Sequence, residues 1–368
     1  MKITDIVVLQ LRIENIENVF DGTQDVLIVQ VLTDTGITGF GEVVSSSYVA
    51  RAIIDAPRSG GGRHGLRSIV TGMSPLDTRA VWEAMYEGTS WYGRRGAAIH
   101  AMAGIDVALW DIIAKAAGTP LYRALGGSDA RRMRAYASVL WGDTVVETER
   151  LARDFRNQGF QAVKFGFGPI GTSLERDVEM VAAARRALGD DADLFVDVGR
   201  RWQVEQAVER AAAFDDYNVG WIEEPLHPDD LSGYAALTQR TAIPIAGAET
   251  EETVAQFKAY LDAGLKVVQP DLGRVGLTQA LEISALARRY GARCVPHCFG
   301  SGVNTTASIH WMAATGGTLT EYPMRSNALC RDLVRGVPSV SDGYVSPGEE
   351  PGLGIELSSD VVEQYAYG

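Results

Sequence analysis

The chain has 368 residues, of which 46% are hydrophobic and 22% are charged, a composition typical of a soluble globular enzyme. Its 34 basic and 47 acidic residues give a net charge of −13, which disfavours nucleic acids and anionic membranes as partners. The sequence lacks an apolar run long enough to span a membrane, a signal-peptide pattern and a disulfide framework, so we expect a cytoplasmic protein.

The first 130 residues predict a small α+β domain. Alternating polar and apolar residues indicate strands over 3–13, 25–34 and 37–43, and apolar spacing indicates helices over 77–92 and 97–117. Two segments, 14–24 and 45–65, are expected as loops. The second is rich in glycine and carries Arg58, Arg63 and His64, with Arg67 just beyond it, which favours an anionic substrate. A solvated surface loop is the alternative.

Residues 131–330 contain a repeated pattern. Short apolar runs alternate with helical segments at intervals of about 25 residues, and most of the runs end in a polar residue. This is the pattern of a (β/α)8 barrel, in which the carboxyl ends of all strands converge on one site. The expected strand ends are Lys164, Asp197, Glu223, Glu249, Asp271, His297 and Glu321.

Three consecutive strands of this series end in a carboxylate, at Asp197, Glu223 and Glu249. Three hard oxygen ligands suit Mg²⁺, which keeps water or substrate oxygens in its other positions. The pattern therefore predicts a magnesium site. Strand-end acids also act as helix N-caps and salt-bridge partners, which is the alternative for any single one of them.

The next two strands end in Asp271 and His297. A carboxylate beside an imidazole fixes its tautomer and raises its basicity, so the pair predicts a general base or acid. A histidine that only caps the following loop is the alternative. Cys294 and Cys298 flank His297, but a zinc site would need further ligands.

Residues 166–171 match G-x-G-x-x-G directly after a predicted strand. Alone, this motif would indicate dinucleotide binding. Here it follows the second strand of a barrel series and no second mononucleotide-binding half is visible, so we expect no nicotinamide cofactor.

The motifs EEP at 223–225, AGAE at 246–249, QPD at 269–271 and PH at 296–297 resemble those of the enolase superfamily, and the His–Asp pair is similar to that of the mandelate racemase subgroup. The resemblance implies a (β/α)8-type barrel with an α+β N-terminal capping domain. It also implies a C-terminal segment, 331–368, that returns to this domain, and a homo-oligomer between dimer and octamer.

The same resemblance assigns roles to residues. Asp197, Glu223 and Glu249 would bind one Mg²⁺ per subunit, His297 with Asp271 would be the catalytic dyad, and Glu321 would hydrogen-bond an enolate oxygen. Loops 14–24 and 45–65 would cover the barrel mouth and select the substrate. The substrate contacts expected from the loops and strand ends are Phe20, Tyr48, Arg58, Lys164 and Arg200.

The sequence departs from the subgroup after its second barrel strand. The subgroup commonly has K-x-K there, with the second lysine as a base opposite the histidine, whereas this chain has Lys164-Phe165-Gly166. We therefore expect Lys164 to bind the substrate carboxylate or to transfer protons itself, and two-base racemisation is disfavoured.

The resemblance implies abstraction of the proton alpha to a carboxylate through an enediolate. We expect dehydration or cycloisomerisation of an acid sugar, either an aldonate or aldarate or its anhydro or lactone form. The alternatives are a racemase or epimerase of a 2-hydroxy acid, and a non-catalytic paralogue that only binds sugar acids. No G-x-S-x-G motif supports a serine hydrolase.

Overall fold

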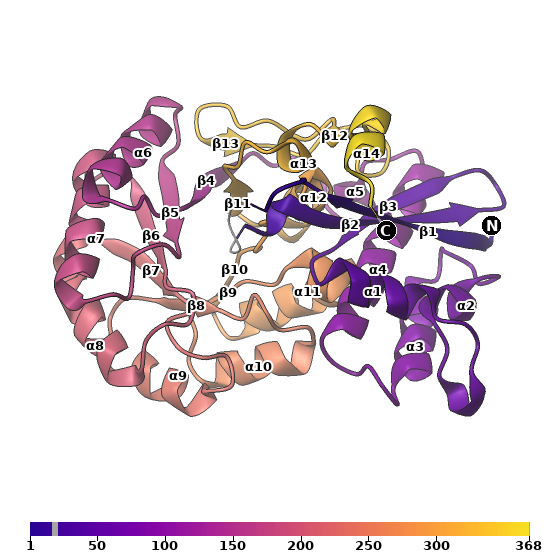
Figure 1. Ribbon diagram of the computed structural model, residues 1–368, viewed down its shortest axis with the longest axis horizontal. Helices are drawn as coiled ribbons and strands as arrows, with labels where there is room; N and C mark the ends of the chain where they lie inside the picture. Colours follow the sequence, from indigo (N-terminus) through magenta and orange to yellow (C-terminus); the bar gives the residue numbers. More distant parts are fainter. Residues whose placement is uncertain (17–20, 368) are drawn as a thin grey trace.

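The computed structural model describes residues 1–16 and 21–367, and it contains a capping region and a barrel (Figure 1). The capping region has an antiparallel sheet in the order β1-β2-β3 with helices on one face. Its elements are β1 (Ile3–Arg12), β2 (Asp25–Thr33), β3 (Thr38–Val43), α1 (Ser47–Asp55), α2 (Leu66–Val70), α3 (Thr78–Thr89), α4 (Ala97–Ala116) and α5 (Leu121–Ala124), with 3-10 turns η1 (Gly22–Gln24) and η2 (Gly60–Gly62).

Helix α4 forms the core of the capping region. By length and composition it could cross a membrane, but 78% of its apolar window is buried inside the structure, as in the core helix of a soluble protein. Strand β3 lies against it without intervening side chains, since a Cβ added at Gly41 would lie 1.9 Å from the carbonyl oxygen of Gly104. Glycine at this position therefore permits the close approach of sheet and helix.

Eight parallel strands form the barrel, and the last, β11, pairs with the first, β4. The strands are β4 (Met133–Leu140), β5 (Ala162–Gly166), β6 (Asp193–Asp197), β7 (Val219–Glu223), β8 (Ile245–Gly247), β9 (Val267–Val268), β10 (Arg293–Cys294) and β11 (Leu319–Pro323). The helices between them are α6 (Val145–Asn157), α7 (Leu174–Leu188), α8 (Val204–Ala213), α9 (Leu231–Thr238), α10 (Val254–Asp262), α11 (Leu272–Arg289) and α12 (Gly302–Thr315), with η3 (Asp215–Tyr217) before β7.

The predicted barrel with an α+β capping domain is therefore confirmed, with one modification. Strand β11 is followed by the four-residue helix α13 (Ala328–Arg331) rather than by an eighth barrel helix. From there the chain runs through β12 (Val334–Arg335), β13 (Tyr344–Val345), β14 (Glu356–Leu357) and α14 (Ser359–Tyr365).

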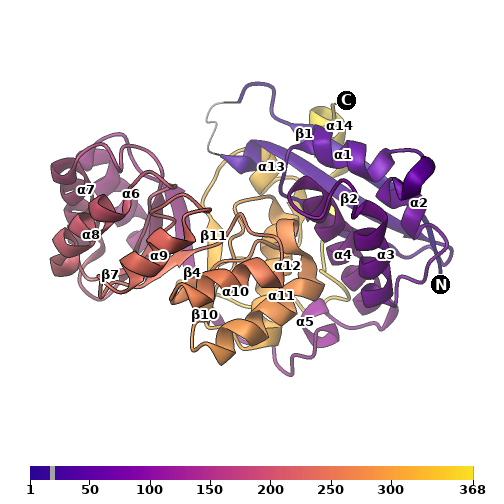
Figure 2. The ribbon, with the colours of Figure 1, turned by 90° about the horizontal axis from the view of Figure 1, so that it is seen from below.

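The C-terminal segment ends on the first strand of the chain. Ala366 bridges to Leu11, and the amide of Tyr367 donates to the carbonyl of Gln10 at 3.0 Å. Figure 2 shows α14 beside β1. The C-terminal end of the chain thus lies on the capping sheet, against the carboxyl end of β1.

Helix α4 also joins the capping region to the barrel through a buried carboxylate. Asp106 accepts hydrogen bonds from the amide of Thr278 at 2.8 Å and from its hydroxyl at 2.6 Å, and Trp110 donates to the same hydroxyl at 3.0 Å. Because Thr278 belongs to α11, which follows directly from Asp271, the capping region is fixed close to the barrel mouth.

Strand alternation sorts the barrel interior into two layers. Each strand places one side chain in a buried cluster at the floor: Tyr136, Ala162, Phe195, Trp221, Ala246, Val267, Val295 and Leu319. Successive residues of a strand point to opposite faces, so the residue two positions later lies above the floor on the same side. Those residues are Ser138, Lys164, Asp197, Glu223, Ala248, Gln269, His297 and Glu321.

Candidate active site at the barrel mouth

Three carboxylates meet at the ends of β6, β7 and β8. Asp197, Glu223 and Glu249 are buried, and each offers an oxygen within 4.8 Å of the others. Asp197 and Glu223 follow the two-residue alternation, but Glu249 lies one position beyond it. Ala248 adopts a left-handed φ of 75°, uncommon for a residue with a side chain, and this break in the strand carries Glu249 to the other two acids.

The three acids suit a divalent cation. Burial, together with the charge of Glu223, raises the pKa of Asp197 well above its usual value, since like charges are crowded in a space without solvent. Three carboxylate oxygens in one cluster are the hard ligands that Mg²⁺ prefers, and Mg²⁺ is the ion that the resemblance to the enolase superfamily implies. The charge of such an ion would relieve the repulsion.

Lys164 lies beside these acids with its ammonium group already engaged. Its Nζ is 2.5 Å from Glu223 Oε1, 2.9 Å from Glu321 Oε1 and 3.9 Å from Asp197 Oδ2. Burial alone would lower the pKa of Lys164, but the charges of Glu223 and Glu321 outweigh it and raise the pKa well above its usual value. The side chain therefore acts here as a fixed cation.

His297 and Asp271 form the predicted pair. His297 Nδ1 is 2.6 Å from Asp271 Oδ2, and Nε2 is 3.4 Å from Glu249 Oε2. Burial lowers the pKa of His297, but the charge of Glu249 and the hydrogen bond with Asp271 outweigh it and raise the pKa to about 9. With Nδ1 held by Asp271, Nε2 is the nitrogen that can exchange a proton with a substrate.

Asn304 holds Asp271 and is itself held by Glu42, and neither Asn304 nor Glu42 was predicted from the sequence. Asn304 Nδ2 donates to Asp271 Oδ1 at 3.0 Å. The carboxylate of Glu42, from the capping strand β3, accepts hydrogen bonds from two backbone N–H groups at the start of α12. These are the N–H of Asn304, at 3.0 Å, and the N–H of Ser301, at 2.9 Å. A hydrogen-bonded chain thus runs from the capping region to His297.

Gln269 and Trp221 hold Glu223 in the same way. Gln269 Nε2 and Trp221 Nε1 donate to Glu223 Oε2 at 2.6 and 3.0 Å. Gln269 is the first residue of the QPD motif and lies two positions after the floor residue Val267, so strand alternation was the signal that could have identified it. Glu223 Oε1 faces Lys164 and the other acids.

Glu321, the expected enolate partner, is fully buried in the middle of β11. The Cys298 amide donates to its Oε2 at 2.6 Å, and Lys164 lies on its Oε1. Burial raises the pKa of Glu321, but Lys164 and His297 outweigh it and lower the pKa below its usual value.

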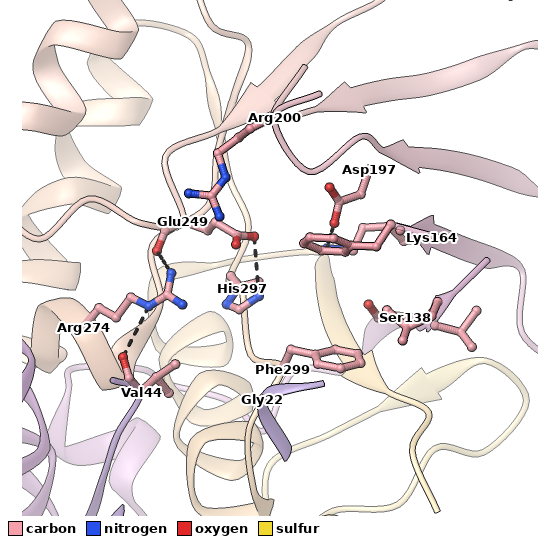
Figure 3. A pocket seen from close by; sticks show the side chains of 14 residues that line it. Gly22, Val44, Ser138, Lys164, Asp197, Arg200, Glu249, Arg274, His297 and Phe299 are labelled. Atoms are coloured by element: carbon pink, nitrogen blue, oxygen red, sulfur yellow. Dashed lines mark hydrogen bonds and ion pairs between the residues drawn. The ribbon is translucent and has the colours of Figure 1, made fainter. Parts of the chain in front are cut away.

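A cavity of about 280 Å³ opens above these residues, and Figure 3 shows its lining. Lys164, Asp197, Glu249 and His297 border it. The volume suits a small metabolite, because it lies at the lower limit of pockets that hold larger ligands. In the G-x-G-x-x-G segment, residues 166–171, the amide of Gly171 donates to Asp177 at 2.7 Å.

Two of the five predicted substrate contacts line the cavity in the structure. Lys164 and Arg200 line the cavity. Tyr48 is 55% exposed and packs edge-to-face on Tyr367, and Arg58 borders a separate surface hollow near Arg67. The described lining includes neither of them. Phe20 lies outside the described residues.

Gly166, at the position of the second lysine, also lines the cavity. A Cβ there would lie 2.8 Å from Asp197 Oδ2. A side chain at this position would therefore press on the first predicted metal ligand unless that carboxylate moved.

Comparison with known proteins agrees with this geometry. The family described as "Enolase C-terminal domain-like" matches residues 147–361, and "Mandelate racemase / muconate lactonizing enzyme, N-terminal domain" matches residues 15–126. The chain is 31% identical to D-galactarolactone cycloisomerase of Agrobacterium fabrum over 92% of its own length and 90% of that protein's. It is also 31% identical to D-galactonate dehydratase of Ralstonia pickettii, over 91% and 90% of the two chains.

Solved structures give the same result. The 3,6-anhydro-D-galactonate cycloisomerase of Zobellia galactanivorans superimposes with a TM-score of 0.91 at 29% identity, covering 100% of both chains. A predicted mandelate racemase of Rhodobacter sphaeroides superimposes with a TM-score of 0.92 at 32% identity, covering 100% of this chain and 95% of that one. The chain therefore belongs to the mandelate racemase and muconate lactonizing enzyme group of the enolase superfamily, and is an enzyme of the lyase or isomerase kind.

Proposed function

We propose that the chain is a Mg²⁺-dependent acid-sugar dehydratase or cycloisomerase in which His297 is the only base. The Nε2 atom of His297 takes the proton from the carbon alpha to the substrate carboxylate. The electron pair of that C–H bond passes into the carboxylate and gives an enediolate. It then forms the double bond to the β-carbon as the C–O bond of that carbon breaks. The departing oxygen accepts a proton from His297, and the enol product tautomerises to a 2-keto acid.

The same elimination accounts for both reaction types. If the departing oxygen is a free hydroxyl, water is lost and the reaction is a dehydration. If it belongs to a ring, the ring opens without loss of atoms and the reaction is a cycloisomerisation. The similarity to proteins named for each type supports this choice and is the reason for keeping both.

One observation carries the assignment of a single base. Apart from the predicted metal ligands and the arginines, which stay protonated, the basic side chains among the described residues that line the cavity are His297 and Lys164. Glu223 and Glu321 already engage the Nζ of Lys164, whereas Asp271 engages only the Nδ1 side of His297, which lines the cavity. Gly166 provides no further group on the opposite side.

The residues around the dyad supply the remaining requirements. Asp197, Glu223 and Glu249 would hold Mg²⁺, which, when bound, stabilises negative charge that develops on the substrate carboxylate. Lys164 fixes the positions of Glu223 and Glu321, and the buried dyad excludes water from His297 Nδ1. These fixed charges are needed because a bare imidazole is too weak a base for a carbon acid of this kind.

A proton NMR screen of acid sugars, their lactones and their anhydro forms, with Mg²⁺, tests the proposal. A 2-keto-3-deoxy acid should form from at least one compound, and formation should stop when the metal is chelated. Inversion at the alpha carbon without elimination would instead establish a racemase or epimerase. Binding without turnover across a complete panel would establish a paralogue that only binds sugar acids.

A further inference from the structure

Two arginines border the cavity near Glu249 (Figure 3). Arg200 follows β6, and its Nε lies 3.4 Å from Glu224 Oε2. Arg274, in the first turn of α11, donates through Nη1 to the carbonyl of Glu249 at 2.7 Å and through Nε to that of Val44 at 3.4 Å. In residues 1–16 and 21–367, neither Nη atom of Arg200 nor Nη2 of Arg274 donates a hydrogen bond.

Arg200 is also held in a costly backbone conformation. Its φ is 67°, in the left-handed region that residues with side chains rarely adopt, and its amide donates to the Glu224 carbonyl at 2.7 Å. Conformations of this kind persist where the surrounding structure enforces them, and they concentrate at ligand sites. Here the consequence is a guanidinium group that borders the cavity with its side chain 36% exposed.

The two arginines differ from the other cation of the site. Lys164 is 3% exposed and its ammonium is shared among three carboxylates, so it has little capacity left for a further anion. Arg200 and Arg274 retain free N–H groups in the planar arrangement that binds a carboxylate through two parallel hydrogen bonds. The arginines lie on the Glu249 side of the cavity, whereas Asp197 and Lys164 lie on the opposite side, here called the metal end (Figure 3).

We propose that Arg200 and Arg274 bind a second carboxylate, and hence that the substrate is a dicarboxylate: an aldarate, or an aldarate derivative that keeps both acid groups or has one of them in a lactone. This inference rests on the proposed function, because that function places the reacting carboxylate at the metal end. A monocarboxylic aldonate would leave the two guanidinium groups without an anion in a confined space, which disfavours its binding.

Equilibrium binding tests this without depending on turnover. Calorimetry with Mg²⁺ would use the His297→Asn protein, so that no ligand is consumed, and a panel of six-carbon aldarates paired with the aldonates of the same configuration. The tightest ligand should be an aldarate that binds about 10- to 100-fold more tightly than its paired aldonate, the range expected for hydrogen bonds to a charged group.

Variants locate the effect. Arg200→Gln should weaken the aldarate about tenfold or more and leave the aldonate nearly unchanged. Arg274→Lys, which retains a charge and a donor toward Glu249, should weaken the aldarate less. Arg240→Gln is the matched control. Arg240 pairs with Glu205 on the surface, so this substitution removes the same charge without altering the cavity.

Three results would overturn the proposal: an aldonate as the tightest ligand, equal weakening of both members of a pair by Arg200→Gln, or no binding by any aldarate. The proposed function is judged separately, by product formation in the parent enzyme. Turnover confined to aldonates would leave that function intact and exclude the dicarboxylate. A preference for aldarate binding without any elimination would support the dicarboxylate site and contradict the proposed function.

Discussion

The floor and the mouth of the barrel are built by the same strands, two residues apart, yet they have opposite chemistry. At the floor, Phe195 and Trp221 stack with ring centroids 3.5 Å apart, and Tyr136 packs edge-on against both. At the mouth, the residues two positions later include Asp197 and Glu223, whose charges repel. The floor residues are buried and stabilise the fold by packing. At the mouth, repulsion between buried carboxylates opposes folding, but these carboxylates are the groups that a metal and a substrate require.

The largest effect is expected at the mouth from His297→Asn. Loss of the general base should lower kcat by about 10²- to 10⁴-fold, while substrate binding is largely kept. Steady-state kinetics together with calorimetric binding would measure the two quantities. If kcat stayed within a few fold of the parent value, the assignment of His297 as the base would be wrong.

The floor should respond in stability instead. Phe195→Ala removes a buried ring from the stacked cluster and should lower the free energy of unfolding by about 3–5 kcal/mol. Because Phe195 lies below the layer that contacts substrate, kcat of the folded protein at low temperature should remain close to that of the parent. Urea unfolding and kinetics on one preparation would check both, and a loss of kcat without a loss of stability would break the division between floor and mouth.

Magnesium binding at the mouth should also affect the free energy of unfolding. At a free concentration 100 times its dissociation constant, Mg²⁺ should stabilise the folded protein by about 2.7 kcal/mol. Asp197→Asn should abolish this stabilisation, and the exposed-site control Asp143→Asn should keep it. Thermal unfolding with Mg²⁺ and with a chelator gives the comparison. Equal stabilisation of both variants would place the metal elsewhere.

The smallest expected effect tests the series of hydrogen bonds that runs from Glu42 in the capping region through Asn304 and Asp271 to His297. Asn304→Ala removes a hydrogen bond to the carboxylate that orients His297, and it should lower kcat by about 10- to 100-fold with little change in KM. Thr305→Ala is the control, because the hydrogen bond that its hydroxyl makes in the described part of the chain runs to the carbonyl of Ser301, the residue before α12. Equal changes in the two variants would show that the helix, rather than this hydrogen bond, was disturbed.

Much of the mouth was predictable because strand spacing fixes it. A carboxylate or imidazole at the end of each short apolar run identified Asp197, Glu223, Asp271, His297 and Glu321, and the fold brings them together. Glu249 was also found as a strand end, although it reaches the site only through the left-handed backbone at Ala248. That break leaves no mark in the apolar pattern.

Other parts of the site were not predictable from local pattern. Glu42 and Asn304 lie on β3 and α12, 262 positions apart, and their contact depends on how the capping region docks. The sequence places Arg274 three residues after Asp271, but it does not show that the guanidinium borders the cavity. That position depends on hydrogen bonds to the carbonyls of Glu249 and Val44. Docking of this kind follows from tertiary packing, which a single sequence does not encode in short motifs.

The most direct test of the central claim is the fate of the alpha proton in substrate recovered after partial reaction in D₂O. With His297 as the only base, deuterium should enter the alpha position with retained configuration or not at all, and His297→Asn should abolish the exchange. Deuterium at an inverted alpha carbon would show that a second base acts on the opposite side, and it would contradict the account.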